Sequence, residues 1–221
     1  MKKKSRIEDR GLRIDIKDLY AITPDQADTA LLVWQVRQVL SGGARVLQYR
    51  NKLSSPVVRF EQASALRQLT QEFGVPLIIN DDAQLAQQVD ADGVHLGGED
   101  GSIAAARQVL GFDKIIGVSC YNRLSLAQQA EGLGADYVAF GAFFASTVKP
   151  RARVAELPLL QEARRVIKLP VVAIGGITLE NGASVLEAGA DALAVISALF
   201  SAPDITLAAR QFANLNTQSS V

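Results

Sequence analysis

A chain of 221 residues, 48% of them hydrophobic, is long enough to fold as one globular domain with a large core. Its 23 basic and 23 acidic residues give a formal net charge of zero, which argues against a nucleic-acid partner. No apolar stretch is long enough to span a bilayer, residues 1–13 lack the apolar core of a signal peptide, and the single cysteine excludes an internal disulfide. The sequence therefore predicts a cytoplasmic protein without a membrane partner.

Short apolar runs rich in β-branched residues alternate with longer amphipathic segments. The predicted strands are Leu19–Ile22, Arg45–Tyr49, Leu77–Asn80, Gly93–Leu96, Ile115–Ser119, Tyr137–Phe140, Val171–Ile174 and Ala192–Ile196. Most lack a polar alternation, which is typical of a parallel sheet covered by helices. Helices are predicted between them, including Asp28–Leu40 with an acidic cap and Pro56–Phe73 with proline in its first turn and Gly74 at its end.

A weak internal repeat precedes four of the strands. Its copies are Ser41-Gly42-Gly43-Ala44, Asp90-Ala91-Asp92-Gly93, Leu133-Gly134-Ala135-Asp136 and Ala188-Gly189-Ala190-Asp191. Three copies have a glycine where a helix would end, as a left-handed cap requires. A repeated helix-turn-strand unit indicates a barrel or an open doubly wound sheet, and eight strands favour a single (β/α)8 TIM barrel over residues 1–221. Residues 1–15 and 216–221 are expected to be flexible ends.

Active sites of such barrels lie at the carboxyl ends of the strands, so the residues there are the candidates. The second strand ends Gln48-Tyr49-Arg50-Asn51-Lys52. Because strand side chains alternate, Gln48, Arg50 and Lys52 should share the side that faces the mouth. An amide and two cations suit a diphosphate, although a solvated strand-loop junction would have the same composition.

Carboxylates follow the third and fourth strands. Asp81 and Asp82 come directly after Asn80, and Asp100 lies in the loop after the fourth strand. Such carboxylates can bind Mg²⁺ together with substrate phosphate oxygens, or they can cap helices. We expect Asp82 to cap and Asp81 to bind metal, while Asp100 can do either.

Paired glycines end the seventh strand, at Gly175-Gly176, and Ile196-Ser197 end the eighth. Barrels often bind phosphate on backbone N–H groups at these two positions, although a glycine turn can also merely reverse the chain. The sixth strand runs into a long connection, 140–150, which suggests a lid, a substrate contact or a simple insertion.

The only histidine, His95, lies within a strand and is expected to be buried and hydrogen-bonded. Cys120 has no histidine in its local sequence, which argues against a nucleophilic role.

Taken in order from about Leu19 to Leu199, these motifs resemble the thiamine phosphate synthase family. The family patterns appear here as Gln48-Tyr49-Arg50-Asn51-Lys52 for QxRxK, Asn80-Asp81, Asp92-Gly93-Val94-His95-Leu96-Gly97-Gly98-Glu99-Asp100 for DGxHxGxxD, Gly117-Val118-Ser119 for GxS, Gly175-Gly176-Ile177 for GGI, and Ile196-Ser197 for IS. The family joins a hydroxymethylpyrimidine diphosphate to a thiazole phosphate and releases pyrophosphate. The resemblance thus implies a pyrimidinylmethyl transferase of thiamine biosynthesis whose partners are these two small molecules.

The same resemblance implies the roles of individual residues. Arg50, Lys52, Ser119 and Lys149 would be catalytic, and Asp81 and Asp100 would bind the Mg²⁺ cofactor. The implied substrate-binding residues are Gln48, Tyr49, Arg50, Asn51, Lys52, Asn80, Ser119, Ser146, Thr147, Val148, Lys149, Gly176, Ile196 and Ser197. Mg²⁺-assisted ionisation of the diphosphate, followed by attack of the thiazole nitrogen, needs no protein nucleophile and no strong base.

Two alternatives share the barrel: a thiazole tautomerase-like isomerase and a non-catalytic protein that binds thiamine phosphate. The second is suggested by Phe144-Ala145-Ser146-Thr147-Val148-Lys149, where the family usually has FPTxTK. The retained diphosphate and metal residues argue against both. Because barrels often pair through their helices, a homo-oligomer is compatible with the sequence.

Overall fold

Parallel strands close into a barrel in which each strand pairs with the next along the chain and β8 pairs with β1. The computed structural model describes residues 14, 16–98, 101–144 and 155–215. The strands are β1 (Asp18–Ile22), β2 (Val46–Tyr49), β3 (Leu77–Asn80), β4 (Gly93–Leu96), β5 (Ile115–Tyr121), β6 (Tyr137–Gly141), β7 (Val171–Ile174) and β8 (Ala192–Val195). Each lies close to its predicted position, and the predicted (β/α)8 barrel is confirmed.

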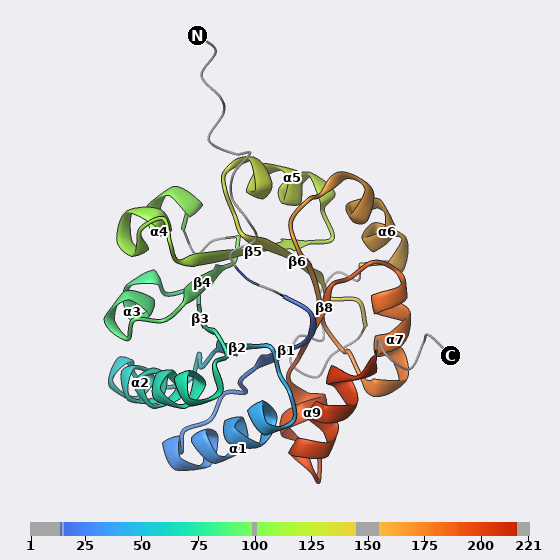
Figure 1. Ribbon diagram of the computed structural model, residues 1–221. Helices are drawn as coiled ribbons and strands as arrows, with labels where there is room; N and C mark the ends of the chain where they lie inside the picture. The colour runs from blue at the N-terminus through green and yellow to red at the C-terminus, as the bar shows by residue number, and fades with distance from the viewer. Residues whose placement is uncertain (1–13, 15, 99–100, 145–154, 216–221) are drawn as a thin grey trace.

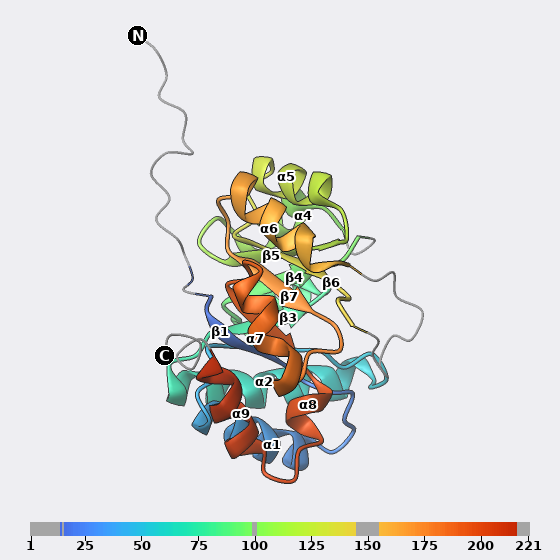
Figure 2. The same ribbon diagram turned by 90° about the vertical axis from the view of Figure 1, so that its right-hand side faces the viewer.

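Helices surround the ring of strands (Figure 1). They are α1 (Thr29–Ser41), α2 (Pro56–Phe73), α3 (Ala83–Gln88), α4 (Ile103–Leu110), α5 (Leu124–Gly132), α6 (Leu157–Val166), α7 (Leu179–Glu187), α8 (Ser197–Phe200) and α9 (Ile205–Ala213). The short α8 follows β8 directly and packs beside α9 (Figure 2). None of the described helices combines the length and the apolar character that a bilayer crossing needs.

The ends of the first two helices follow the predicted capping chemistry. Helix α1 begins at Thr29, directly after its cap Asp28. The Asp28 carboxylate accepts a hydrogen bond from the backbone N–H of Leu31 at 3.0 Å. Helix α2 begins at Pro56 behind the Ser55 cap and ends at Gly74, whose φ of 64° is left-handed. Such caps satisfy backbone groups that a helix leaves without partners at its ends.

The internal repeat also has a clear structural role. Gly43, Gly134 and Gly189 adopt φ values of 102°, 88° and 117°, and Asp90 takes the same left-handed region at 50°. Two residues later, three copies place an aspartate that accepts a hydrogen bond from the first residues of a neighbouring strand. These bonds are Leu77 N to Asp92, Ile116 N to Asp136 and Val171 N to Asp191, each at 2.8 Å. The repeat thus turns the chain out of a helix and fastens the amino end of the adjacent strand.

Two apolar clusters fill the molecule. One lies between the strands and the helices. The other fills the barrel interior and contains Ile14, Ile16, Tyr20, Ile22, Val46, Ile78, Ile115, Tyr137, Ala139, Val172, Ala192 and Ala194. The side chain of Ile14 is buried in it, although the sequence placed this residue in the flexible amino-terminal end. The other residues of both expected ends lie outside the described part of the chain.

Tyr137 occupies the interior next to a glycine that makes room for its ring. Gly117 of β5 pairs in register with Tyr137 of β6. A Cβ atom at Gly117 would lie 1.9 Å from Cζ of the tyrosine, far inside van der Waals contact. Gly117 is therefore required for this packing.

Candidate active site

A central cavity of about 670 Å³ opens at the carboxyl ends of the strands. Of the predicted site residues, it is lined by Gln48, Arg50, Asn80, Ser119, Gly176, Ile196 and Ser197. They come from β2, β3, β5 and the segments after β7 and β8, far apart in the sequence. The expected convergence of strand ends at one rim is confirmed for these positions.

Gln48 and Arg50, two residues apart along β2 and its extension, lie at different depths in the central cavity. Gln48 is 3% exposed and donates from Nε2 to the Tyr20 hydroxyl at 2.8 Å. Arg50 lies higher, with Nη1 3.1 Å from the carboxylate of Asp25. The Arg50 backbone is fastened as well, since its N–H donates to Thr23 Oγ1 and its carbonyl accepts from the same hydroxyl. The guanidinium is thus held in place beside the cavity before any anion binds.

Tyr49 and Asn51 point to the other side of β2. The Tyr49 hydroxyl donates to Gln62 Oε1 at 2.8 Å, and Asn51 Nδ2 donates to the same oxygen at 3.0 Å. Burial raises the pKa of Tyr49. Both side chains support the junction of β2 and α2 and do not line the central cavity, so a substrate contact through them remains a prediction.

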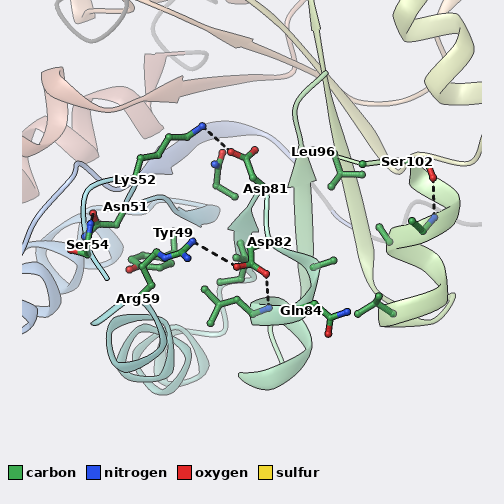
Figure 3. A pocket seen from close by; sticks show the side chains of 18 residues that line it. Tyr49, Asn51, Lys52, Ser54, Arg59, Asp81, Asp82, Gln84, Leu96 and Ser102 are labelled. Atoms are coloured by element: carbon green, nitrogen blue, oxygen red, sulfur yellow. Dashed lines mark hydrogen bonds and ion pairs between the residues drawn. The ribbon is translucent and has the colours of Figure 1, made fainter. Parts of the chain in front are cut away.

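Lys52 and Asp81 form an ion pair with 2.9 Å between Nζ and Oδ2 (Figure 3). They line a side pocket of about 590 Å³, which also contains Tyr49 and Asn51 and shares Asn80 with the central cavity. The predicted alignment of Lys52 with Gln48 and Arg50 is therefore wrong, because the chain leaves the extended conformation after β2. Asp81 has a φ of 64°, a left-handed conformation that aspartate tolerates better than most residues. Lys52, a predicted diphosphate ligand, is thus paired in the resting site with Asp81, the predicted metal ligand.

Asp82 caps α3 as predicted. Its Oδ1 accepts from the backbone of Leu85 at 2.9 Å, and its other oxygen lies 3.7 Å from Arg59 Nη1 (Figure 3). Within the described residues, no group of three or more His, Cys, Asp or Glu side chains is arranged to hold a metal ion. Mg²⁺ often needs only one or two carboxylates together with substrate phosphate, and the hard oxygen donors of Asn80 and Asp81 fit that requirement.

Polar side chains form the floor of the cavity. The Tyr20 and Tyr137 hydroxyls lie 2.7 Å apart, Tyr137 lies 2.9 Å from His95 Nδ1, and His95 Nε2 lies 2.8 Å from Ser119 Oγ. Burial raises the pKa of both tyrosines, so both stay protonated at neutral pH. The expectation of a buried, hydrogen-bonded His95 is confirmed. Cys120 is buried in the cluster between the strands and the helices, and burial raises the pKa of its thiol to about 12.

The turn after β7 has a left-handed backbone at two successive positions, a conformation that favours glycine. Gly175 and Gly176 adopt φ values of 106° and 62°. Asn181 fastens the turn, because its Nδ2 donates to the Gly176 carbonyl at 3.0 Å and its Oδ1 accepts from the Thr178 N–H at 2.9 Å. Beside this turn, after the neighbouring strand β8, α8 begins at Ser197, and the first N–H groups of a helix have no acceptor within the helix.

Five predicted site residues lie outside the described residues. They are Asp100, Ser146, Thr147, Val148 and Lys149.

The family model described as thiamine monophosphate synthase matches residues 19–199. The chain belongs to this family. It is 60% identical over 200 residues to the thiamine-phosphate synthase of Methylobacillus flagellatus, covering 90% of this chain and 95% of the relative. A second relative, the thiamine-phosphate synthase of Azoarcus sp., is 57% identical over 189 residues, covering 86% and 92%.

A solved structure of the thiamine phosphate pyrophosphorylase from Pyrococcus furiosus superimposes with a TM-score of 0.84 at 38% identity, covering 96% of this chain and all of the other. The predicted family and enzyme class, a transferase of the thiamine-phosphate synthase kind, are therefore confirmed.

Sequence reasoning missed several residues of this thiamine monophosphate synthase family member that shape its cavity. Asp25 and Thr23 fix Arg50, and they follow β1, a strand end that the same rule about barrel rims would have singled out. Arg123 follows β5 and lines the cavity, again at a strand end. Tyr20 and Tyr137 gave no signal, because an aromatic residue inside an apolar run is indistinguishable from core.

Proposed function

We propose that the central cavity joins a hydroxymethylpyrimidine diphosphate to a thiazole phosphate, forming thiamine phosphate and releasing pyrophosphate. The observation that best supports this proposal is a single cavity lined by Gln48, Arg50, Asn80 and Ser119 and also by the glycine turn and Ser197. Side-chain donors and cations gather on one side, and backbone amides lie on the other. Such a division suits two phosphorylated substrates that must meet between them.

Arg50 and Lys52 would hold the diphosphate. Each is paired with a carboxylate, Asp25 for Arg50 and Asp81 for Lys52. Arg50 can keep its partner while its other N–H groups face the cavity, because a guanidinium has five donors. Lys52 is 53% exposed and can turn from Asp81 to a phosphate oxygen at small cost.

Release of Lys52 would leave the Asp81 carboxylate available as a magnesium ligand, with Asp100 as the second predicted ligand. When bound there, Mg²⁺ supplies positive charge that stabilises the leaving diphosphate. Lys52 and Asp81 neutralise each other in the resting site, and each would gain a new partner of opposite charge in the complex. This exchange would keep both charges paired in both states.

The reaction would begin with cleavage of the bond between the pyrimidine methylene carbon and the diphosphate oxygen. The bonding electron pair leaves with pyrophosphate, and the aminopyrimidine ring spreads the positive charge of the methylene. The thiazole nitrogen then donates its lone pair to that carbon. Arg50, Lys52 and Ser119 would stabilise charge that grows on the leaving oxygens, the kind of interaction that contributes most to many enzymatic rates.

The thiazole phosphate would bind at the glycine turn and the start of α8. Gly176 and Ser197 would provide backbone N–H groups, and Ile196 would form part of the apolar wall. Ser146, Thr147 and Val148 are proposed to complete this half of the site, and Lys149 is proposed to contact the diphosphate.

The proposed partners are the two small-molecule substrates, and the proposed location is the cytoplasm, where a single reduced cysteine is stable. Light scattering after gel filtration will decide whether the chain forms the homo-oligomer that its sequence allows.

A pyrophosphate-release assay tests the function. The purified chain with both substrates and Mg²⁺ should release pyrophosphate, and omission of the thiazole phosphate should stop turnover. Absence of product at saturating concentrations of both substrates would refute the proposal.

A pair of neighbouring carboxylates provides the test of the metal site. Asp81→Asn should raise the Mg²⁺ concentration required for half-maximal activity about 10- to 100-fold, since a charged ligand is lost. Asp82→Asn is the control, because asparagine caps a helix as well as aspartate does. Equal Mg²⁺ dependence of the two variants would place the metal elsewhere.

A further inference from the structure

A continuous row of hydrogen bonds crosses the floor of the central cavity. It runs from Gln48 through Tyr20, Tyr137 and His95 to Ser119, with successive distances of 2.8, 2.7, 2.9 and 2.8 Å. These five side chains are called the floor chain below. Both of its ends are residues of the proposed diphosphate site, while its middle members are buried and have no other assigned role.

One direction of the donors, which runs from Gln48 to Ser119, uses every hydroxyl proton of Tyr20 and Tyr137 within the floor chain, and it is the direction that we infer. An amide nitrogen can only donate, so the Tyr20 oxygen accepts a hydrogen bond from Gln48 Nε2. In the inferred direction, Tyr20 donates a hydrogen bond to the Tyr137 oxygen, and Tyr137 donates one to His95 Nδ1. A neutral imidazole that accepts at Nδ1 carries its proton on Nε2, which therefore donates to Ser119 Oγ.

This direction decides what Ser119 can do. Its oxygen accepts a hydrogen bond from His95 Nε2, so its own hydroxyl proton points away from His95. Ser119 is only partly buried and lines the central cavity. The hydroxyl is thereby oriented as a donor toward the cavity, where an anion needs donors and not acceptors.

We propose that Tyr20, Tyr137 and His95 are positioning residues that hold the Ser119 hydroxyl as a hydrogen-bond donor to the diphosphate. The inference rests on the proposed function for the identity of the anion, but the direction of the bonds depends on the resting chain alone. Preorganised donors stabilise developing charge without reorganising during the reaction.

A purely structural role explains the floor chain less well. Tyr20 is 1% exposed and Tyr137 is 0% exposed, at positions where the neighbouring interior residues are aliphatic. Phenylalanine would fill the same volume without buried hydroxyls that must be satisfied. The hydroxyls are useful if they set the tautomer of His95 and, through it, the orientation of Ser119.

His95 is the only histidine of the sequence, so its tautomer can be measured without ambiguity. The protein is labelled with ¹⁵N-histidine, and long-range proton–nitrogen correlation spectra are recorded near pH 8. The expected spectrum has an unprotonated Nδ1 and a protonated Nε2 in the wild type, and a mixture of tautomers in Tyr137→Phe, which loses the donor to Nδ1. A wild-type spectrum with the proton on Nδ1, or on both nitrogens, would overturn the proposal.

A double-mutant cycle tests whether Tyr137 acts through Ser119. Ser119→Ala should lower kcat about 100-fold, as removal of a donor to developing charge does. Tyr137→Phe should lower kcat about tenfold with a smaller change in KM, because the lost bond matters most in the transition state. In the Ser119→Ala background, Tyr137→Phe should change kcat less than about twofold. Losses that multiply in the double variant would show that Tyr137 acts independently and would overturn the inference.

Thr70→Val provides the control for loss of a buried hydroxyl. Thr70 is fully buried on α2, and its Oγ1 donates to the Arg67 carbonyl at 3.0 Å, remote from the cavity. It should match Tyr137→Phe in lost stability and keep the wild-type kcat. A wild type that releases no pyrophosphate would refute the proposed function, and the tautomer spectrum would still decide the direction of the floor chain.

Discussion

Replacing Gly117 by alanine adds one methyl group at a crowded point of the barrel interior. The new Cβ would lie 1.9 Å from Cζ and 2.3 Å from the hydroxyl of Tyr137, whereas ordinary contacts begin at 3.4 Å. The ring must therefore retreat by about 1.5 Å, the difference between 3.4 and 1.9 Å. Such a shift breaks the bonds of Tyr137 to Tyr20 and His95, which are already 2.7 and 2.9 Å long.

The expected loss of stability has two parts. Overpacking of a core costs about 1–3 kcal/mol. A buried polar group left without its partner costs about 1–3 kcal/mol more. Gly117→Ala should thus lower the free energy of unfolding by roughly 2–6 kcal/mol, which for a domain of this size lowers Tm by about 4–24 °C.

Urea unfolding and pyrophosphate release measured on the same preparation check both consequences. Activity should fall at least as far as in Tyr137→Phe, because Ser119 loses its orientation. Gly132→Ala is the control, since a Cβ atom at this helical position meets no atom within 4 Å and should leave stability unchanged or raise it by up to about 1 kcal/mol. Wild-type stability and activity of Gly117→Ala would refute the described packing of Tyr137.

Three further outcomes are expected. Asp136→Ala should lower the free energy of unfolding by about 3–5 kcal/mol in urea titrations, because Arg107, only 8% exposed, loses its counter-charge. Asp191→Ala should cost less than half as much, because its partner Arg164 is 63% exposed. Burial raises the pKa of Tyr20 and Tyr137, so the unfolded chain loses these protons first; the free energy of unfolding should stay level to about pH 9 and fall above it by up to about 1.4 kcal/mol per pH unit for each phenol, and a level profile to pH 11 would contradict this. With the pKa of Cys120 raised to about 12, Ellman's reagent at about pH 8 should label the thiol only after unfolding, and rapid labelling of the native protein would contradict its burial.

The sequence by itself determined the barrel and much of its rim. Strands buried on both faces must be continuously apolar, and helix ends need caps, so strands and the bounds of α2 could be predicted from local patterns. The rule that parallel strands end at one rim then grouped Gln48, Arg50, Asn80 and Ser119 correctly. The period of two along β2 separated Arg50 from Tyr49, although the resemblance to the family implies substrate contacts for both.

Only the tertiary structure decided which groups touch. Nothing in the local sequence pairs Lys52 with Asp81, or Arg50 with Asp25, because each pair joins different strand ends. The floor chain could not be predicted from the sequence for the same reason. Its members come from five strands, and Tyr20 and Tyr137 look like ordinary core residues. A side chain's chemistry depends on its nearest polar neighbours, and in a closed barrel those neighbours lie across the sheet and not along the chain.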